Sequence, residues 1–102
     1  MIDIRVNRDK MTVIATGHAD APRTDDGRDL VCCAVSTLVQ TVLYSCQGLP
    51  GVIVTHDIKP GDAYVSISSP DSQMDAVRHR LDMLSDGIRH LEEKFPMCVK
   101  LK

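Results

Sequence analysis

A histidine and a cysteine in the N-terminal third of the chain have side chains suited to nucleophilic chemistry. His18 follows a stretch that alternates like a strand, and Cys32 lies in the first turn of a segment with helical periodicity. A thiol is a strong nucleophile as the thiolate, and the amides at a helix N-terminus stabilise that anion and lower its pKa from about 8.5. A nearby imidazole takes the thiol proton and later returns it to a leaving group. The pair predicts nucleophilic catalysis with Cys32 as nucleophile and His18 as general base.

The residues around Cys32 suggest how such a site would be completed. Asp29 stands at the start of the helical periodicity, where it is either the N-cap or a carboxylate that orients His18. The first amides of a helix lack partners within it, so those of Cys32 and its neighbours are expected to form an oxyanion hole. Cys33 is the rival nucleophile. On a helical wheel Cys32 falls at the edge of the apolar face beside Ser36, whereas Cys33 falls on the polar face, which favours Cys32.

The other cysteines and histidines are expected to have structural roles. On residue pattern alone, Cys32 and Cys33 also have an alternative reading as inert thiols, because unpaired cysteines are often buried. A zinc site is disfavoured because adjacent cysteines project about 100° apart on a helix. No metal and no cofactor is therefore expected. Cys46 is expected in the core, Cys98 in a strand, and the remaining histidines at the surface: His56, His79 and His90.

Apolar spacing along the chain changes from alternation to helical periodicity twice, which predicts the order ββαββα with a possible C-terminal strand. The predicted elements cover, in chain order, residues 2–6, 11–16, 29–48, 52–56, 63–67, 71–95 and 97–101. This order favours an α+β fold, a two-layer sandwich in which two helices pack on a mostly antiparallel sheet. No linker composition interrupts it, so a single domain over residues 1–102 is predicted.

Each predicted helix carries an apolar stripe that marks its core-facing side. The first stripe consists of Val31, Ala34, Val35, Leu38, Val42 and Leu49. The second consists of Met74, Val77, Leu81, Leu84, Ile88, Leu91 and Phe95. Pro96 is expected to end the second helix, because proline cannot continue a helical hydrogen-bond ladder.

Charge and composition narrow the class of protein. A formal net charge of −2 and a pI near 6.0 disfavour direct nucleic-acid binding, which needs clustered Lys and Arg. The N-terminus enters an alternating strand with no export signal, and polar residues interrupt the apolar region 30–49, so no membrane span is expected. A cytoplasmic protein with four reduced thiols is predicted.

The segment from Gly17 to Ser36 resembles the signature of the Prp family of ribosomal-processing cysteine proteases. It has Gly-His-Ala, an acidic loop that ends in glycine, and then Gly-x-Asp-Leu-Val-Cys-x-Ala-x-Ser. The resemblance implies that His18 and Cys32 form the catalytic dyad and that Asp29 and Ser36 occupy further motif positions. It also implies a homodimer that removes the N-terminal extension of bacterial large-subunit ribosomal protein twenty-seven. The chain departs from the pattern in a slightly longer loop and in Cys33, which replaces a small alanine.

The loop between His18 and Cys32 suggests how a substrate would be attracted. Its acidic residues would give the cleft a negative field suited to a basic ribosomal protein precursor, and they are Asp20, Asp25, Asp26 and Asp29. Gly17 and Gly27 are expected to act as hinges that let the loop close. The alternative is a non-catalytic ribosome-assembly module that binds a basic partner through this loop and the polar face of the first predicted helix. A possible twofold dimer surface is the polar stripe of Thr37, Gln40, Thr41 and Tyr44.

Overall fold

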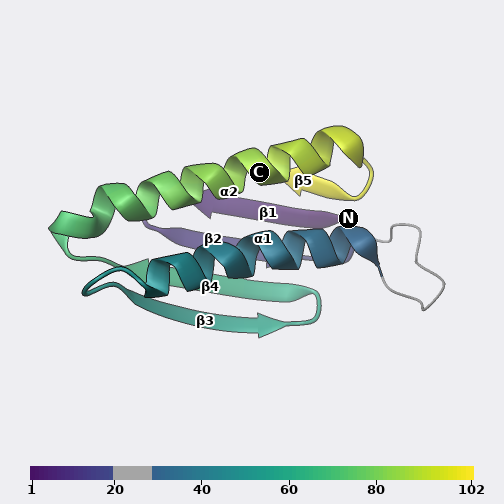
Figure 1. Ribbon diagram of the computed structural model, residues 1–102. Coiled ribbons are helices and arrows are strands. Elements are labelled where there is room, and N and C mark those ends of the chain that lie inside the picture. The colour runs from purple at the N-terminus through teal and green to yellow at the C-terminus, as the bar shows by residue number, and fades with distance from the viewer. Residues whose placement is uncertain (20–28) are drawn as a thin grey trace.

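The computed structural model describes residues 1–19 and 29–102, which form five strands and two long helices (Figure 1). The strands are β1 (Ile2–Asn7), β2 (Thr12–Thr16), β3 (Ile53–Lys59), β4 (Asp62–Ser68) and β5 (Val99–Leu101). The helices are α1 (Leu30–Gln47) and α2 (Met74–Lys94), the latter preceded by a short 3-10 turn, Asp71–Gln73. The predicted order of elements is confirmed, including the C-terminal strand.

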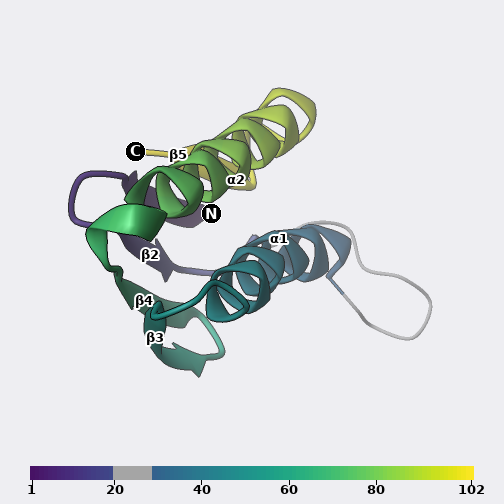
Figure 2. The same cartoon turned by 60° about the vertical axis from the view of Figure 1, so that its left-hand side comes forward.

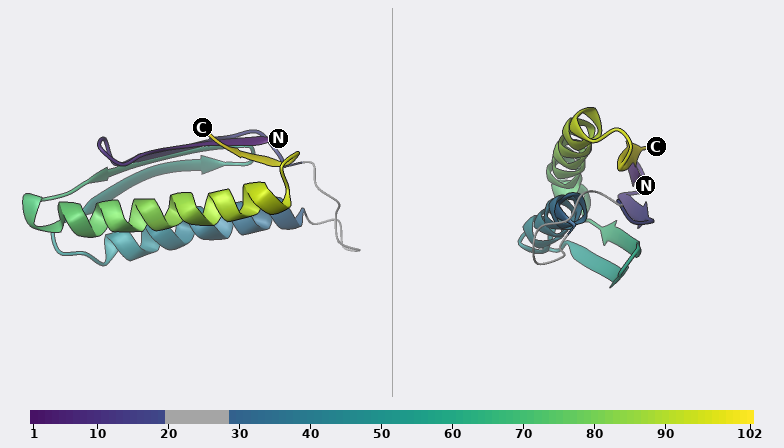
Figure 3. Two further views of the ribbon diagram at one scale, coloured as in Figure 1. Left: turned by 90° about the horizontal axis from the view of Figure 1, so that it is seen from above. Right: turned by 90° about the vertical axis from the view of Figure 1, so that its right-hand side faces the viewer.

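The strands form one sheet in the order β3-β4-β2-β1-β5. All neighbours are antiparallel except β1 and β5, which run parallel with Ile2 opposite Val99. Both helices lie on the same side of this sheet, as the view from above shows (Figure 3). The predicted α+β class, a mostly antiparallel sheet with two helices, is confirmed.

Strand alternation places the apolar side chains of the sheet beneath the helices. In β1, Ile2 and Ile4 are buried while Arg5 is exposed. In β2, Val13 and Ala15 are buried while Ile14 between them is exposed. These side chains meet the helices in one core, in which α2 contributes its fully buried residues Val77, Leu81, Leu84 and Ile88. The second predicted stripe is therefore correct along the middle of α2.

The face that α1 buries differs from the predicted stripe. Its buried side chains are Val31, Val35, Val39, Leu43 and Cys46, whereas Ala34, Leu38 and Val42 are half-buried. The reason is that α1 packs against two neighbours. One side of the helix faces the sheet, and another side faces α2 (Figure 2). Leu38 faces α2, where a Cβ placed on Gly87 would lie 3.2 Å from its methyl groups. A single stripe cannot describe a helix that packs in two directions.

The prediction for the end of α2 is corrected in two details. The helix ends at Lys94, and Phe95 is its half-exposed C-cap rather than a core residue. Cys98 precedes β5 instead of lying in it, because its amide and that of Val99 both donate to the Phe95 carbonyl in a turn after the helix.

Within the described residues, α1 is long and apolar enough to cross a membrane by length and composition, with a hydropathy of 1.5 over 18 residues. A core helix of a soluble protein meets the same criterion. Here five of the 18 side chains of α1 are buried in the core.

Candidate active site

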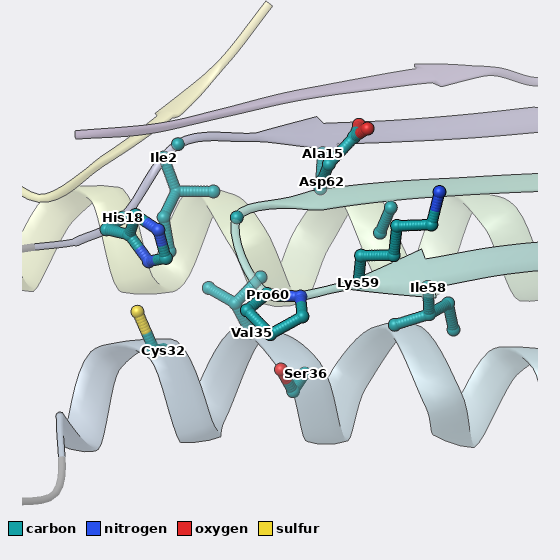
Figure 4. Close-up of a pocket in the computed structure, with 13 residues that line it drawn as sticks. Ile2, Ala15, His18, Cys32, Val35, Ser36, Ile58, Lys59, Pro60 and Asp62 are labelled. Atoms are coloured by element: carbon teal, nitrogen blue, oxygen red, sulfur yellow. The ribbon is translucent and has the colours of Figure 1, made fainter.

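A cleft of about 410 Å³ opens between the N-terminal end of α1 and the end of the sheet that carries the β3–β4 turn (Figure 4). Four separate parts of the chain line it: Ile2 at the start of β1, the end of β2 with His18, the first turns of α1 with Cys32 and Ser36, and the β3–β4 turn. The pairing of β2 with β4 brings the β3–β4 turn beside the end of β2. Sheet topology therefore assembles this cleft from segments far apart in the sequence.

Asp29 starts α1 and holds its first turn. Its backbone is extended, and its carboxylate Oδ1 accepts hydrogen bonds from the amides of Val31 and Cys32, each 3.0 Å long. The residue is buried, with 7% of its surface exposed. Of the two roles considered for Asp29, the structure shows the N-cap directly, through these two hydrogen bonds.

These contacts overturn one expectation about the helix start. The Val31 and Cys32 amides are bonded to the Asp29 carboxylate, and the Cys33 amide donates to the Asp29 carbonyl at 3.0 Å. The first-turn amides are therefore engaged in capping, and the predicted oxyanion hole at Cys32 is wrong for this conformation.

The Cys32 side chain projects from α1 into the cleft, and its sulfur points toward the His18 ring (Figure 4). It is half-buried, and the amide of Ala19 donates to its Sγ at 3.4 Å. Cys33 is exposed and lies instead along the groove between α1 and α2, with Leu38 and His90. Of the two adjacent thiols, only Cys32 lines the cleft that contains His18.

His18 leaves the end of β2 over a tightly constrained backbone. Gly17 has φ +94°, and a Cβ at that position would collide with the Met1 carbonyl oxygen. The Gly17 amide donates to the Gly61 carbonyl at 2.9 Å, which continues the pairing of β2 with β4 by one residue. A glycine is required at position 17 for these steric reasons, whereas its action as a hinge stays a prediction.

The cleft wall is mostly apolar with charges at one rim. Its apolar side chains come from both layers: Ile2, Ala15, Val35, Ile58 and Ala63. Lys59 and Asp62 stand at the β3–β4 turn, and Ser36 lies one helical turn beyond Cys32. Such a wall suits a ligand that buries apolar groups in the cleft and keeps polar groups near the rim.

The structure thus gathers four predicted site residues, Gly17, His18, Cys32 and Ser36, around one cleft and places Asp29 as the helix cap. Gly27 and the acidic residues Asp20, Asp25 and Asp26 lie outside the described residues. The sequence interpretation missed the role of residues 58–63, of which residues 59–62 are predicted only as a turn between two strands. No local pattern marks them, because their role depends on which strand lies next to β2.

The remaining cysteines and histidines have the exposures expected of them. Cys46 is fully buried, and burial raises the pKa of its thiol. His56, His79 and His90 are exposed. Across residues 1–19 and 29–102, no three His, Cys, Asp or Glu side chains gather as a metal site would require.

Fold and cleft together define a small α+β protein with a thiol and an imidazole that face each other in one cleft. The model of the cysteine protease Prp family matches residues 1–100. The chain belongs to this family, which confirms the resemblance seen in its sequence. No curated protein matches it significantly.

Solved structures with the same fold include two of the ribosomal processing protease Prp from Staphylococcus aureus. One holds a covalently linked product peptide; it is 24% identical, with a TM-score of 0.76 over 99% of this chain and 95% of that one. The other holds a substrate peptide and is 23% identical, with a TM-score of 0.73 over the same shares. SMU.848 from Streptococcus mutans is 24% identical, with a TM-score of 0.69 over 99% and 90%. At these identities the likeness establishes the fold.

Proposed function

We propose that this cysteine protease is a cytoplasmic endopeptidase that removes the N-terminal extension of bacterial large-subunit ribosomal protein twenty-seven, with Cys32 as nucleophile and His18 as general base. The observation that supports this most directly is the placement of both side chains in one cleft, with the Cys32 sulfur pointing to the imidazole. The family supplies the reaction class. The Staphylococcus aureus relative is a ribosomal processing protease that has been solved with peptides.

The proposed reaction follows from these two groups. His18 takes the proton of Cys32, and the thiolate attacks the carbonyl carbon of the scissile peptide bond. The tetrahedral intermediate collapses as His18 gives its proton to the leaving amine, which leaves a thioester on Cys32. Water, deprotonated by His18, then attacks the thioester carbonyl, releases the new carboxylate and restores the thiol. The Ala19 amide, already directed at Sγ, stabilises the thiolate between these steps.

The test is mass spectrometry of the ribosomal protein precursor after incubation with wild-type protein, Cys32→Ser, His18→Ala or Cys33→Ser under reducing conditions. We expect one defined N-terminal truncation. Cys32→Ser and His18→Ala lower its rate by at least about a thousandfold, as removal of a nucleophile or its base does in other proteases. Cys33→Ser is the matched control, since its exposed side chain lies outside the cleft, and it retains the wild-type rate.

The alternative is a non-catalytic assembly module that binds a basic partner. In that case the precursor stays intact in every tube, and Cys32→Ser supports ribosome assembly in cells as well as the wild type does. A truncation that is lost with Cys33→Ser instead of Cys32→Ser contradicts the assignment of the nucleophile while keeping the protease function. The proposed homodimer is tested separately by the molar mass in sedimentation equilibrium.

A further inference from the structure

Gly61, in the turn between β3 and β4, lies directly against the imidazole of His18. A Cβ built on Gly61 would stand 2.6 Å from Nε2 and 3.0 Å from Cε1 of that ring. Real Cβ atoms do not approach other atoms this closely, so any residue other than glycine would force the ring away from its present position. The contact is with the ring itself, across 43 residues of sequence.

The same residue also fixes the backbone that carries the histidine. The Gly61 carbonyl accepts the 2.9 Å hydrogen bond of the Gly17 amide, immediately before His18. Gly61 therefore acts on the imidazole in two ways: its carbonyl holds the backbone just before His18, and its lack of a Cβ leaves room for the ring. Cys32 faces the ring from α1, on the other wall of the cleft.

We propose that Gly61 is a positioning residue for the proposed catalytic base: its lack of a side chain and its carbonyl together seat the His18 imidazole opposite Cys32. This inference rests on the proposed Cys–His function. It places part of the catalytic geometry in the β3–β4 turn, outside the motif that runs from Gly17 to Ser36.

The local turn gives glycine a second reason to be at this position, which the experiment has to separate from the first. Gly61 has φ +77° and follows Pro60, as in a type II turn, where the third residue needs a positive φ. Asparagine tolerates a positive φ better than alanine but still has a Cβ. Gly51 has nearly the same φ, +74°, and its added Cβ would meet only the Pro70 ring, at 3.2 Å. Gly51→Ala is therefore a matched control for the backbone strain.

The experiment compares Gly61→Ala, Gly61→Asn and Gly51→Ala with the wild type in two assays. The first measures kcat and KM on the ribosomal precursor. We expect both Gly61 variants to lose about a hundredfold in kcat, the effect of misplacing a catalytic group by about 1 Å, with KM within about threefold. Gly51→Ala keeps its kcat within about twofold, although its melting temperature falls as much as that of Gly61→Ala.

The second assay follows alkylation of Cys32 by iodoacetamide as a function of pH, resolved from the other thiols by peptide mapping. It needs no protein substrate. In the wild type, a thiol close to the imidazole reacts at lower pH than an ordinary thiol, whose pKa is about 8.5. His18→Ala, Gly61→Ala and Gly61→Asn are expected to shift this profile upward together, while Gly51→Ala leaves it in place.

The outcomes separate the positioning role from the proposed function. A Gly61→Asn variant with wild-type kcat and an unshifted alkylation profile overturns the positioning role. So does a rise in KM alone, which would mean that the added Cβ only obstructs the substrate. If the wild type does not cleave the precursor, the choice of substrate fails, and the alkylation profiles still decide whether Gly61 places His18. If His18→Ala leaves the profile unshifted, the dyad itself fails and the inference falls with it.

Discussion

Among single residues, Asp29 connects stability to the chemistry most directly, because its carboxylate caps the turn that presents Cys32. Replacing an aspartate N-cap by alanine costs about 1 kcal/mol, within a range of about 0.5–2. We expect Asp29→Ala to lower the free energy of unfolding by that amount in urea titrations. The fraying first turn moves Sγ, so the cleavage rate should fall about tenfold.

Asp29→Asn is the conservative variant for this prediction, since an amide oxygen can accept the same two hydrogen bonds without the charge. It should restore the unfolding free energy to within about 0.5 kcal/mol of wild type and recover most of the rate that Asp29→Ala loses. A variant that regains stability while staying inactive would show that the charge itself acts on the site. The orienting role for Asp29 would then replace capping as its main contribution.

At the scale of single residues, local sequence patterns singled out two residues that the fold brings to one cleft. His18 and Cys32 stood out because a strand end and a helix start are short-range patterns, and both line the cleft. The oxyanion hole failed because the same helix start has a cap, and one set of amides cannot serve both partners. Gly61 was missed because its contact with His18 depends on the pairing of β4 with β2, which no local pattern reveals.

For whole elements, helix α2 is the clearest case of a face defined by its apolar spacing. Leu84 is 1% exposed and Met83, its neighbour, is 72% exposed. Leu84→Ala should lower the free energy of unfolding by about 2–5 kcal/mol, since it removes buried atoms and leaves a cavity. Met83→Ala should change it by no more than about 0.5 kcal/mol. Urea unfolding monitored by circular dichroism measures both.

The two substituted residues are adjacent in α2, and helix propensity is similar for Leu, Met and Ala. Helix propensity therefore cannot account for a difference between the two losses of stability. Equal losses would mean that α2 does not pack on the sheet with the face described. The contrast with α1 explains why one stripe was predicted well and the other was not. Most of the buried residues of α2 form one continuous row. In α1, some apolar residues face the sheet and others face α2, as Leu38 does beside Gly87.

The molecule as a whole has its helices on one face of the sheet (Figures 1 and 3), and the candidate site lies at one end of that sheet, beside the end of β2 and the start of α1. The parallel pair of β1 and β5 ties the C-terminal strand to the strand that begins the fold, with the Ile2 amide donating to the Cys98 carbonyl at 2.8 Å. Helical and alternating periodicity predicted the elements and their layers. They did not predict the strand order, which depends on how long loops close and which edges meet.

Cys46 lies near the end of α1 and is fully buried in the core. Because the core unfolds as one unit, the protonation of this thiol contributes to the free energy of unfolding of the whole molecule. Burial raises the pKa of this thiol, an effect that the positive charge of Arg80 partly offsets. The folded chain therefore keeps Cys46 protonated at pH values where the unfolded chain, with an ordinary thiol pKa of about 8.5, has lost the proton. This stabilisation is fully present below that pH and decreases above it, by at most about 1.4 kcal/mol per pH unit.

The matching measurement is the free energy of unfolding of wild type and Cys46→Ala between pH 7 and pH 10 in urea with reductant. Wild type should be more stable at pH 7, because Cys46→Ala leaves a small cavity. The difference in unfolding free energy should then narrow as the pH rises above about 8.5. The reason is that ionisation of this thiol stabilises the unfolded chain of the wild type, whereas Cys46→Ala has no thiol to ionise at this position. The other three cysteines are present in both proteins, so their contributions cancel in the difference. A difference that stays constant over the whole range would mean that Cys46 ionises equally readily in the folded and unfolded chains, and that it does not belong to the buried core.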